Sequence, residues 1–260
     1  MVIYYINVNK MKGFICMNNF EQLYHSNDTL NIFVDASIKK YPNETIGCPG
    51  AIAINNESII DSKIEILRHT TNNNSEITAI YYGVLLAIKY KNDYKTINLF
   101  SDSKICVFGL REWIFNWIKN LKFSNNISDY TMEYNPYKLI GSNNSEVANQ
   151  SEIILVIQTI LANDLNINIY HQRGHIATTK YKSIAEAKNT FCKNNNVDIR
   201  LETVINISYY NNMIDELTRS NLQKFEYSYI DRNISAVYFN FNPEMDMDKY
   251  SKLLNLSSLK

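Results

Sequence analysis

Four acidic side chains, widely spaced along the chain, lie where the sequence predicts that a strand ends or a helix begins. Asp35 closes the apolar run LNIFVD, and Asp102 follows the strand candidate TINLF. Glu76 and Asp215 are predicted in the first turns of two helices. Ligands of open α/β sheets bind at the carboxyl ends of the strands. Carboxylates gathered there repel one another unless a cation lies between them, and Mg²⁺ prefers carboxylate oxygens. The pattern therefore predicts a magnesium site.

Taken singly, three of these acids also have an ordinary structural explanation. An acid in the first turn of a helix complements the helix dipole, which accounts for Glu76 and Asp215. Asp102, directly before Ser103, is compatible with a helix N-cap. Asp35 is the hardest to explain in this way, because an acid at the end of an apolar strand is costly to bury unless it is paired. The occurrence of all four together is what favours a metal site.

Hydrophobic periodicity predicts an α/β fold with a mixed sheet flanked by helices. The strands are expected at 30–35, 51–55, 58–66, 96–100 and 167–170, with the second and third forming a hairpin. The helices are expected at 75–90, 103–120, 150–163 and 185–193, and a last one from near Asn212. Trp113 and Trp117 are expected to face the core. We predict a domain at 29–222 with insertions at about 121–149 and 176–208, and extensions at 1–28 and 223–260.

Charge and cysteine content narrow the functional classes. Lys+Arg and Asp+Glu both number 26, so any attraction to nucleic acid must come from a local patch. The four cysteines form no CxxC pair, which argues against a zinc knuckle or a redox motif and suits a reducing compartment. No apolar run approaches the roughly 20 residues that a membrane span needs, and the N-terminus lacks a signal-peptide pattern. We therefore expect a cytoplasmic protein with no membrane association (in the host cytoplasm if its source is a virus or a phage).

Five motifs around the acids resemble those of ribonuclease HI, the family that cuts the RNA strand of RNA–DNA hybrids. They are TTNNNSE at 70–76, DSKICVFGLREWIFNWIK at 102–119, VAN at 147–149, GH at 174–175 and DEL at 215–217. The resemblance covers roughly 30–175 and 209–220. It implies the ribonuclease H-like fold, a five-stranded mixed sheet with helices on both faces.

The resemblance also implies roles for individual residues. It implies two Mg²⁺ ions, with Mn²⁺ as an alternative, on Asp35, Glu76, Asp102 and Asp215. His175 matches the mobile catalytic histidine of the family. The Thr-Asn segment of the family touches the phosphate and the sugar hydroxyl, which implies substrate contacts by Thr71, Asn72 and Asn73. The implied reaction is endonucleolytic hydrolysis that leaves 5′-phosphate and 3′-hydroxyl ends, by a chain that we expect to be a monomer.

Three departures from the family pattern leave alternatives open. His175 and Asp215 are separated by 40 positions (215 − 175), where the family has a short loop, so His171 is a rival for the histidine role. Lys104 replaces the usual glutamine and either reaches a phosphate or points to solvent. The segment after the Trp-rich helix has few basic residues. The segment 173–200 is richer, and either binds the duplex or is a solvated face; its basic residues are Arg173, Lys180, Lys182, Lys188, Lys193 and Arg200.

Two other functional classes remain open at this point. The first is another nuclease of the same broad fold, a resolvase or an exonuclease, although Ser37 stands where such exonucleases place a second acid. The second is a nucleic-acid-binding module without turnover, for which the long insertion before Asp215 is the best support.

Overall fold

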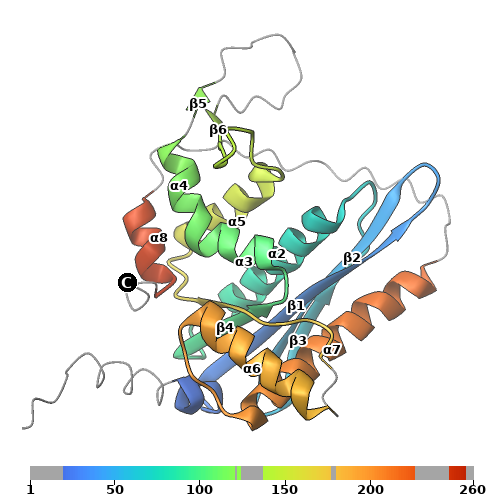
Figure 1. Cartoon of the computed structure of the whole chain (residues 1–260), viewed down its shortest axis with the longest axis vertical. Helices are drawn as coiled ribbons and strands as arrows, with labels where there is room; N and C mark the ends of the chain where they lie inside the picture. The colour runs from blue at the N-terminus through green and yellow to red at the C-terminus, as the bar shows by residue number, and fades with distance from the viewer. Residues whose placement is uncertain (1–19, 121, 124–136, 177–179, 226–245, 256–260) are drawn as a thin grey trace, which may run out of the picture.

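A computed structural model describes residues 20–120, 122–123, 137–176, 180–225 and 246–255 (Figure 1). Its main sheet has five strands in the order β3-β2-β1-β4-β7. They are β1 (Thr29–Lys40), β2 (Thr45–Asn55), β3 (Ser58–Ile64), β4 (Thr96–Ser101) and β7 (Asn168–His171). β1, β4 and β7 run parallel, whereas β2 is antiparallel to both β1 and β3. The predicted five-stranded mixed sheet and its β2–β3 hairpin are confirmed.

The centre of this sheet fixes the positions of two of the acids. The parallel pairing of β1 with β4 ends at Val34 and Ser101, so Asp35 and Asp102 each come one residue later, on neighbouring strands. The expectation that Asp35 ends its strand is wrong. β1 continues to Lys40, because beyond Val34 it still pairs with β2 on its other side, from Asp35 opposite Gly50 onward. The antiparallel partner thus carries Asp35 past the end of the parallel pairing.

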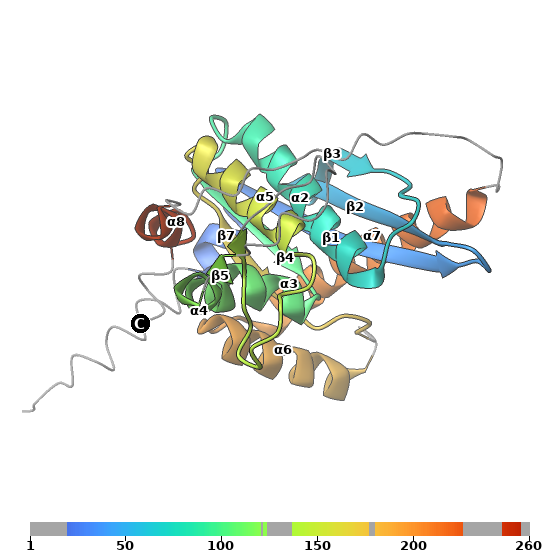
Figure 2. The same ribbon diagram turned by 90° about the horizontal axis from the view of Figure 1, so that it is seen from above.

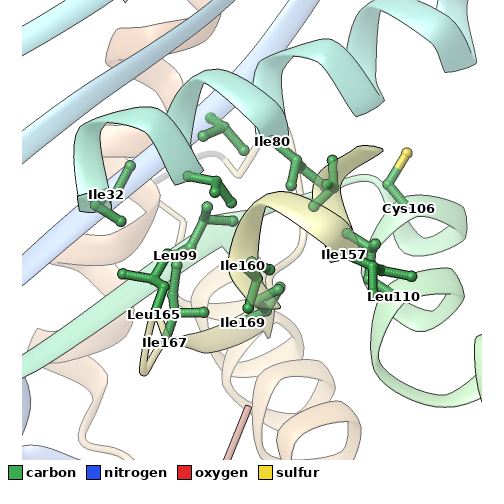
Figure 3. Packing of buried hydrophobic residues seen from close by; sticks show 14 of the residues in the cluster. Ile32, Ile80, Leu99, Cys106, Leu110, Ile157, Ile160, Leu165, Ile167 and Ile169 are labelled. Atoms are coloured by element: carbon green, nitrogen blue, oxygen red, sulfur yellow. The ribbon is translucent and has the colours of Figure 1, made fainter. Parts of the chain in front are cut away.

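Helices cover both faces of the sheet (Figures 1 and 2). α2 (Asn72–Tyr90) and α5 (Gln150–Ala162) lie on one face, and α6 (Tyr181–Asn195) and α7 (Leu201–Lys224) lie on the other. Because side chains alternate along a strand, Ile32 and Val34 pack into the first core and Phe33 into the second. Figure 3 shows the first core, in which Ile80 of α2, Leu99 of β4 and Ile157 of α5 meet.

A wide turn interrupts the helix that follows Asp102. α3 (Lys104–Phe108) passes into the π-helical segment η1 (Gly109–Trp113), and α4 (Ile114–Lys119) continues from it. The amide of Ile114 bonds to the carbonyl of Gly109, five residues back. This wider turn rotates the following residues away from the 3.6-residue pattern. The prediction that Trp113 faces the core is therefore wrong: Trp113 is 36% exposed, whereas Arg111 is buried.

Two helices begin earlier than the sequence pattern predicts. α2 begins at Asn72 with Thr71 as its N-cap, so Glu76 lies beyond the first turn. α7 begins at Leu201 and not near Asn212, which places Asp215 in the middle of a 24-residue helix. The early turns of α7 form because Val204 and Ile207 pack into the second core. The helix-dipole explanation for Glu76 and Asp215 therefore does not apply.

Segments outside the central domain pack against it. Phe20 and Tyr24 lie in a short helix at 20–24 and are buried in the second core. α8 (Met247–Leu253) inserts Tyr250 into the first core. In the first predicted insertion, which follows α4 in the chain, β5 (Lys122–Phe123) pairs with β6 (Tyr137–Lys138). Residues 121 and 124–136 of that insertion, and residues 1–19, 226–245 and 256–260 of the extensions, lie outside the described residues. Within the part that is described, no helix has the length and apolar character of a membrane span.

Candidate active site

The four acids predicted from the sequence gather at the carboxyl edge of the sheet. Asp35 comes from β1, Asp102 directly follows β4, Glu76 comes from α2 and Asp215 from α7. Burial, together with the negative charges of Asp102, Asp215 and Glu76, raises the pKa of Asp35 to about 8. Burial and the charge of Glu76 also raise the pKa of Asp102. These shifts show that the carboxylates act on one another across a small, partly desolvated space.

Two glycines allow the segments around the acids to approach one another closely. A Cβ on Gly174 would overlap the carboxylate of Asp102, so the loop after β7 passes directly against that acid. A Cβ on Gly50 would lie 2.7 Å from the Thr218 methyl and 3.0 Å from Ile214. Since Gly50 pairs with Asp35, α7 approaches the sheet at the level of Asp35. That approach carries Asp215 toward the other acids.

Two of the carboxylates, Asp35 and Glu76, accept hydrogen bonds from neighbouring residues. Asp35 accepts a hydrogen bond from the Ala36 amide at 2.7 Å. The two oxygens of Glu76 accept one bond each, from Asn72 Nδ2 at 2.7 Å and from the Ser103 hydroxyl. Ser103 is the N-cap of α3 but makes no side-chain cap bond there, so its hydroxyl serves Glu76 and Asp102 is not the cap.

A divalent cation fits the chemistry of this edge. Four carboxylates lie close enough to raise the pKa of Asp35, so a cation would relieve their repulsion. As the side chains stand, however, no three His, Cys, Asp or Glu residues of the described part already surround one point at ligand distance. Glu76 accepts hydrogen bonds from Ser103 and Asn72, and Asp215 pairs with Arg219. The donor set, four carboxylates at one edge of the sheet, is of the kind that a divalent cation prefers.

The structure distinguishes the two histidines. His175 is 77% exposed, and its Nδ1 lies 3.8 Å from Asp215 Oδ2. Its charge also lowers the pKa of Asp102. His171 is buried, and its Nδ1 lies 2.8 Å from Asn194 Nδ2. The geometry thus favours His175 for the role at the carboxylates and gives His171 a structural one.

Acid should destabilise the fold through His171. Burial lowers its pKa to about 4, helped by the charges of Lys104 and Arg111, whereas in an unfolded chain it is about 6.5. The unfolded chain therefore binds a proton first, so stability is full above pH 6.5 and falls toward pH 4, by about 3 kcal/mol from this group. Urea unfolding at pH 7 and pH 4.5 measures the loss. We expect His171→Gln to lose less stability between pH 7 and pH 4.5 than the wild type does. The control His25→Gln, on a half-exposed histidine, should lose as much as the wild type. A loss in His171→Gln equal to that of the wild type would contradict this assignment.

The predicted substrate residues lie near Glu76 and Asp102. Thr71 and Asn72 are exposed at the start of α2, and Asn73 is half-buried beside them. Thr71 caps the helix by accepting a bond from the Asn74 amide at 3.2 Å. Lys104 is exposed, and its Nζ lies 5.8 Å from the centre of the Phe108 ring. The structure thus places Thr71, Asn72 and Asn73 as a group at the Glu76 end of the site, with Lys104 directed toward Phe108.

Four polar residues at the site were not predicted from the sequence. They are Ser103 on Glu76, Arg219 on Asp215, Asn211 on Asp102, and Gln172 on Asn211. A sequence signal existed for two of them, because Asn211 and Arg219 stand four residues before and after Asp215, on the same face of a helix. Gln172 gave no signal, since its contact joins positions 39 residues apart.

A family model and several solved structures match this chain. The RNase H family model matches residues 27–223. Among solved structures, the RNase H domain of PFV is 15% identical, with 65% of this chain and 96% of that chain covered and a TM-score of 0.42. LC11-RNase H1, isolated from compost by a metagenomic approach, is 11% identical over 65% and 96% of the two chains, with a TM-score of 0.38. RNase H1 of the archaeon Halobacterium salinarum is 11% identical, with 63% of this chain and 93% of that chain covered and a TM-score of 0.35.

No curated protein matches the chain. The family model, in contrast, spans the whole sheet, the helices on both faces and all four acids. The chain therefore belongs to the RNase H family and is a ribonuclease H.

Proposed function

We propose that this ribonuclease H cuts the RNA strand of RNA–DNA hybrids endonucleolytically, in a reaction that depends on divalent metal ions and leaves 5′-phosphate and 3′-hydroxyl ends. The observation that carries the proposal is the meeting of Asp35, Glu76, Asp102 and Asp215 at one edge of the sheet, where burial and the charges of the other three raise the pKa of Asp35. Membership of the RNase H family supports the same chemistry.

The carboxylates would hold the cofactor. Two Mg²⁺ ions are proposed, with Mn²⁺ as an alternative; once bound, such ions lower the pKa of the attacking water and offset charge on the scissile phosphate. Asp102 must be ionised to act as a ligand. The hydrogen bond from Asn211 and the charge of His175 both favour its ionised form, against the effect of burial. The chain thus offsets part of the repulsion among its own acids.

His175 is the candidate for proton transfer. Its side chain is 77% exposed at the end of the loop that passes Asp102, and Asp215 lies 3.8 Å away. An exposed imidazole next to a carboxylate can give a proton to the leaving 3′ oxygen and recover one from water. The preference for RNA is assigned to Asn72 and its neighbours Thr71 and Asn73. Asn72 donates its amide to Glu76, which leaves its carbonyl oxygen to accept a bond from a ribose 2′-hydroxyl.

The proposed duplex-binding surface includes fewer basic residues of 173–200 than the sequence suggested. Within 173–200, Arg173 pairs with Glu186, and Lys188 pairs with Asp198. Lys180 and Lys182 are exposed at the start of α6, shortly after His175 in the chain. Lys193 is exposed near the end of α6, and Arg200 is exposed directly before α7. We therefore assign the phosphate contacts nearest the site to Lys180 and Lys182.

Neutralising this pair should weaken binding through lost charge alone. Lys180→Gln/Lys182→Gln is expected to raise the Kd for hybrid and to lower the slope of log K against log [salt] by about two, roughly one for each phosphate contact. Fluorescence anisotropy in EDTA measures both quantities without turnover. The control is Lys91→Gln/Lys95→Gln, on exposed lysines around the turn before β4, at the opposite edge of the sheet. An unchanged salt slope in the first variant would remove α6 from the binding surface.

A cleavage panel tests the proposed function against the alternatives. The substrates are end-labelled RNA–DNA hybrid, double-stranded RNA, double-stranded DNA, a four-way junction and both single strands, each with Mg²⁺, Mn²⁺ or EDTA. We expect internal cuts in the RNA of the hybrid alone, with 5′-phosphate ends and only when metal is present. Hybrid binding without cutting would support a non-catalytic module, whereas cutting of the junction or stepwise loss from a 3′ end would support a resolvase or an exonuclease.

We further propose that the protein acts as a monomer in the cytoplasm, in keeping with its thiols and its lack of a long apolar run in the sequence. Light scattering of the purified chain checks the first part, and cell fractionation checks the second.

A further inference from the structure

A polar cavity of about 260 Å³ lies at the amino end of β1, the end of that strand away from the acids. Thr29 begins β1 six positions before Asp35, so a strand rise of about 3.3 Å per residue places the two roughly 20 Å apart. The wall also includes residues of the helix at 20–24, of the turn between β2 and β3, and of α7. None of the described residues assigned to catalysis lines this cavity, so it is separate from the proposed active site.

The side chains around this cavity are fixed by hydrogen bonds to one another. Tyr24 donates its hydroxyl to Asn206 Oδ1 at 2.6 Å, and Tyr210 donates its hydroxyl to the Glu57 carbonyl at 3.0 Å. The first bond leaves the amino group of Asn206 to donate, and both phenol oxygens can still accept. Thr29, which is 1% exposed, has a hydroxyl that finds no hydrogen-bond partner within the described part of the chain. The wall of the cavity therefore holds donors and acceptors that the fold itself does not use.

A glutamate occupies an unfavourable backbone position beside this cavity. Asn56 and Glu57 form the two-residue turn between β2 and β3, with φ angles of 47° and 61°. Turns of this kind favour glycine at the second position, because a residue with a side chain is strained at positive φ. The fold alone therefore does not account for Glu57. What this residue adds is a carboxylate at the wall of the cavity.

The composition of the wall argues against three common classes of ligand. Its described residues include no lysine or arginine, so a phosphate would meet no permanent positive charge. Glu57 is the one carboxylate among them, whereas a divalent cation prefers several. Ile54 is their one aliphatic side chain, so an apolar ligand would gain little from burial. An uncharged ligand that both donates and accepts hydrogen bonds fits this wall.

Adjacent hydroxyl groups have the chemistry that this wall requires. Each hydroxyl both donates and accepts. A carboxylate can accept from them, as acidic side chains do from the ribose of bound dinucleotides, and the Asn206 amino group can donate to them. The volume of the cavity is below the roughly 300–1,000 Å³ of pockets for drug-sized ligands, which limits the buried part of a ligand to a single ring. A ribose meets both conditions.

We propose that this cavity binds the vicinal 2′- and 3′-hydroxyls of a ribose, with Glu57 accepting from them and Asn206 donating to them. Two sources carry this group, a ribonucleoside and the free pentose. The proposal goes beyond hybrid cleavage and does not depend on it, since the acids lie toward the other end of β1.

Adenosine, 2′-deoxyadenosine and ribose are the probes, each titrated into the ¹⁵N-labelled full chain and followed by NMR. We expect adenosine to bind saturably and to shift the signals of the Asn206 side-chain amide and the Glu57 backbone amide. The signals of Asn72, beside the acids, should stay in place. 2′-Deoxyadenosine lacks one of the two hydroxyls and should bind at least about tenfold more weakly, because the groups that bond a hydroxyl are left unpaired without it. Ribose that binds as tightly as adenosine would support the proposal with the free pentose as the source.

Glu57→Gly separates a ligand site from a structural turn. Glycine relieves the strained φ, so we expect the Tm of the ligand-free protein to rise. The same change removes the carboxylate, so the Kd for adenosine should increase about tenfold. The matched control is Asp164→Gly, on another acid with a positive φ, which follows α5 and lies outside the cavity wall. This control should leave adenosine binding unchanged.

Several results would overturn the assignment of a ribose to this cavity. Absence of saturable binding of both adenosine and ribose would mean that the cavity holds water only. Shifts confined to Asn72 and its neighbours would place the nucleoside at the acids instead. Equal affinities for adenosine and 2′-deoxyadenosine, or wild-type affinity in Glu57→Gly, would equally contradict it. If Glu57→Gly does not fold, Asn206→Asp replaces the amino donor, keeps the acceptor for Tyr24, and should likewise weaken adenosine binding.

Discussion

Asp102→Asn is expected to reduce hybrid cleavage by at least about a thousandfold while hybrid binding in EDTA stays within about twofold of the wild type. Asp102 lies at the centre of the site, between the sheet, the Gly174 loop and the Asn211 amide. An amide keeps the shape of the side chain but removes the charge that a divalent ion needs. Metal-assisted charge stabilisation contributes several kcal/mol, and each 1.36 kcal/mol changes the rate tenfold. Single-turnover cleavage of labelled hybrid measures the loss.

The matched control for this change is Asp93→Asn, on an exposed acid in the turn between α2 and β4. This variant should cleave at the wild-type rate, because the turn lies at the amino end of β4, whereas Asp102 follows its carboxyl end. Residual Mg²⁺-dependent cutting by Asp102→Asn at more than about a tenth of the wild-type rate would mean that the catalytic centre lies elsewhere or that the activity comes from a contaminant.

Asp35→Asn should stabilise the metal-free protein at alkaline pH. Burial and the charges of its acidic neighbours raise the pKa of Asp35 to about 8 in the fold, against an ordinary value near 3.8. The folded state therefore favours the protonated acid, so stability is lost as pH rises from about 4 through 8. One unit of pKa corresponds to about 1.4 kcal/mol, and the gain from removing the charge should reach a few kcal/mol at pH 9. Thermal unfolding in EDTA measures this gain, because each kcal/mol of added stability should raise Tm by about 2–4 °C.

Two comparisons make this result specific to the site. The gain should shrink as pH falls toward 4 and vanish below about pH 3, where Asp35 is protonated in both states. Saturating Mg²⁺ should stabilise the wild type and leave Asp35→Asn nearly unchanged. The control Asp61→Asn removes an acid whose pKa is lowered by Lys89, so that change should not stabilise the protein at any pH. Equal stability of Asp35→Asn and wild type in EDTA at pH 9 would show that the acids do not repel one another in the fold.

The effects expected for Asp102→Asn and Asp35→Asn have one origin, the grouping of the four acids. This grouping lowers the stability of the fold but is needed for activity. Carboxylates that repel one another in the fold are the ones that a cation would need. Two of them, Glu76 and Asp215, also have local partners in Ser103 and Arg219. A functional site that is unfavourable for the fold is a common feature of enzymes.

Much of the fold could be read from local patterns. The apolar runs at 30–35, 96–100 and 167–170 predicted three strands of the sheet, because a strand covered by helices on both faces is apolar at almost every position. The 3.6-residue periodicity of 75–90 predicted α2 within a few residues. The chemical identity of the site was also local: the four acids and His175 stand in short motifs that needed no tertiary information to notice.

The exact bounds of the elements depended on partners far away in the sequence. Asp35 lies inside β1 because β2 continues to pair with that strand after β4 has ended. α7 begins at Leu201 because its first turns cover the second core. Trp113 is exposed and Arg111 buried because a π-helical turn breaks the periodicity, and Arg111 bonds to Asn195 of α6 at 2.8 Å.

The sequence by itself determined the five strands, the main helices and the set of acids, because burial periodicity and residue chemistry are properties of short segments. Only the tertiary structure decided which histidine faces the acids and which lysines of 173–200 remain exposed. Those contacts depend on the order of strands in the sheet and on the approach of α7 to it. A local pattern carries no information on that order.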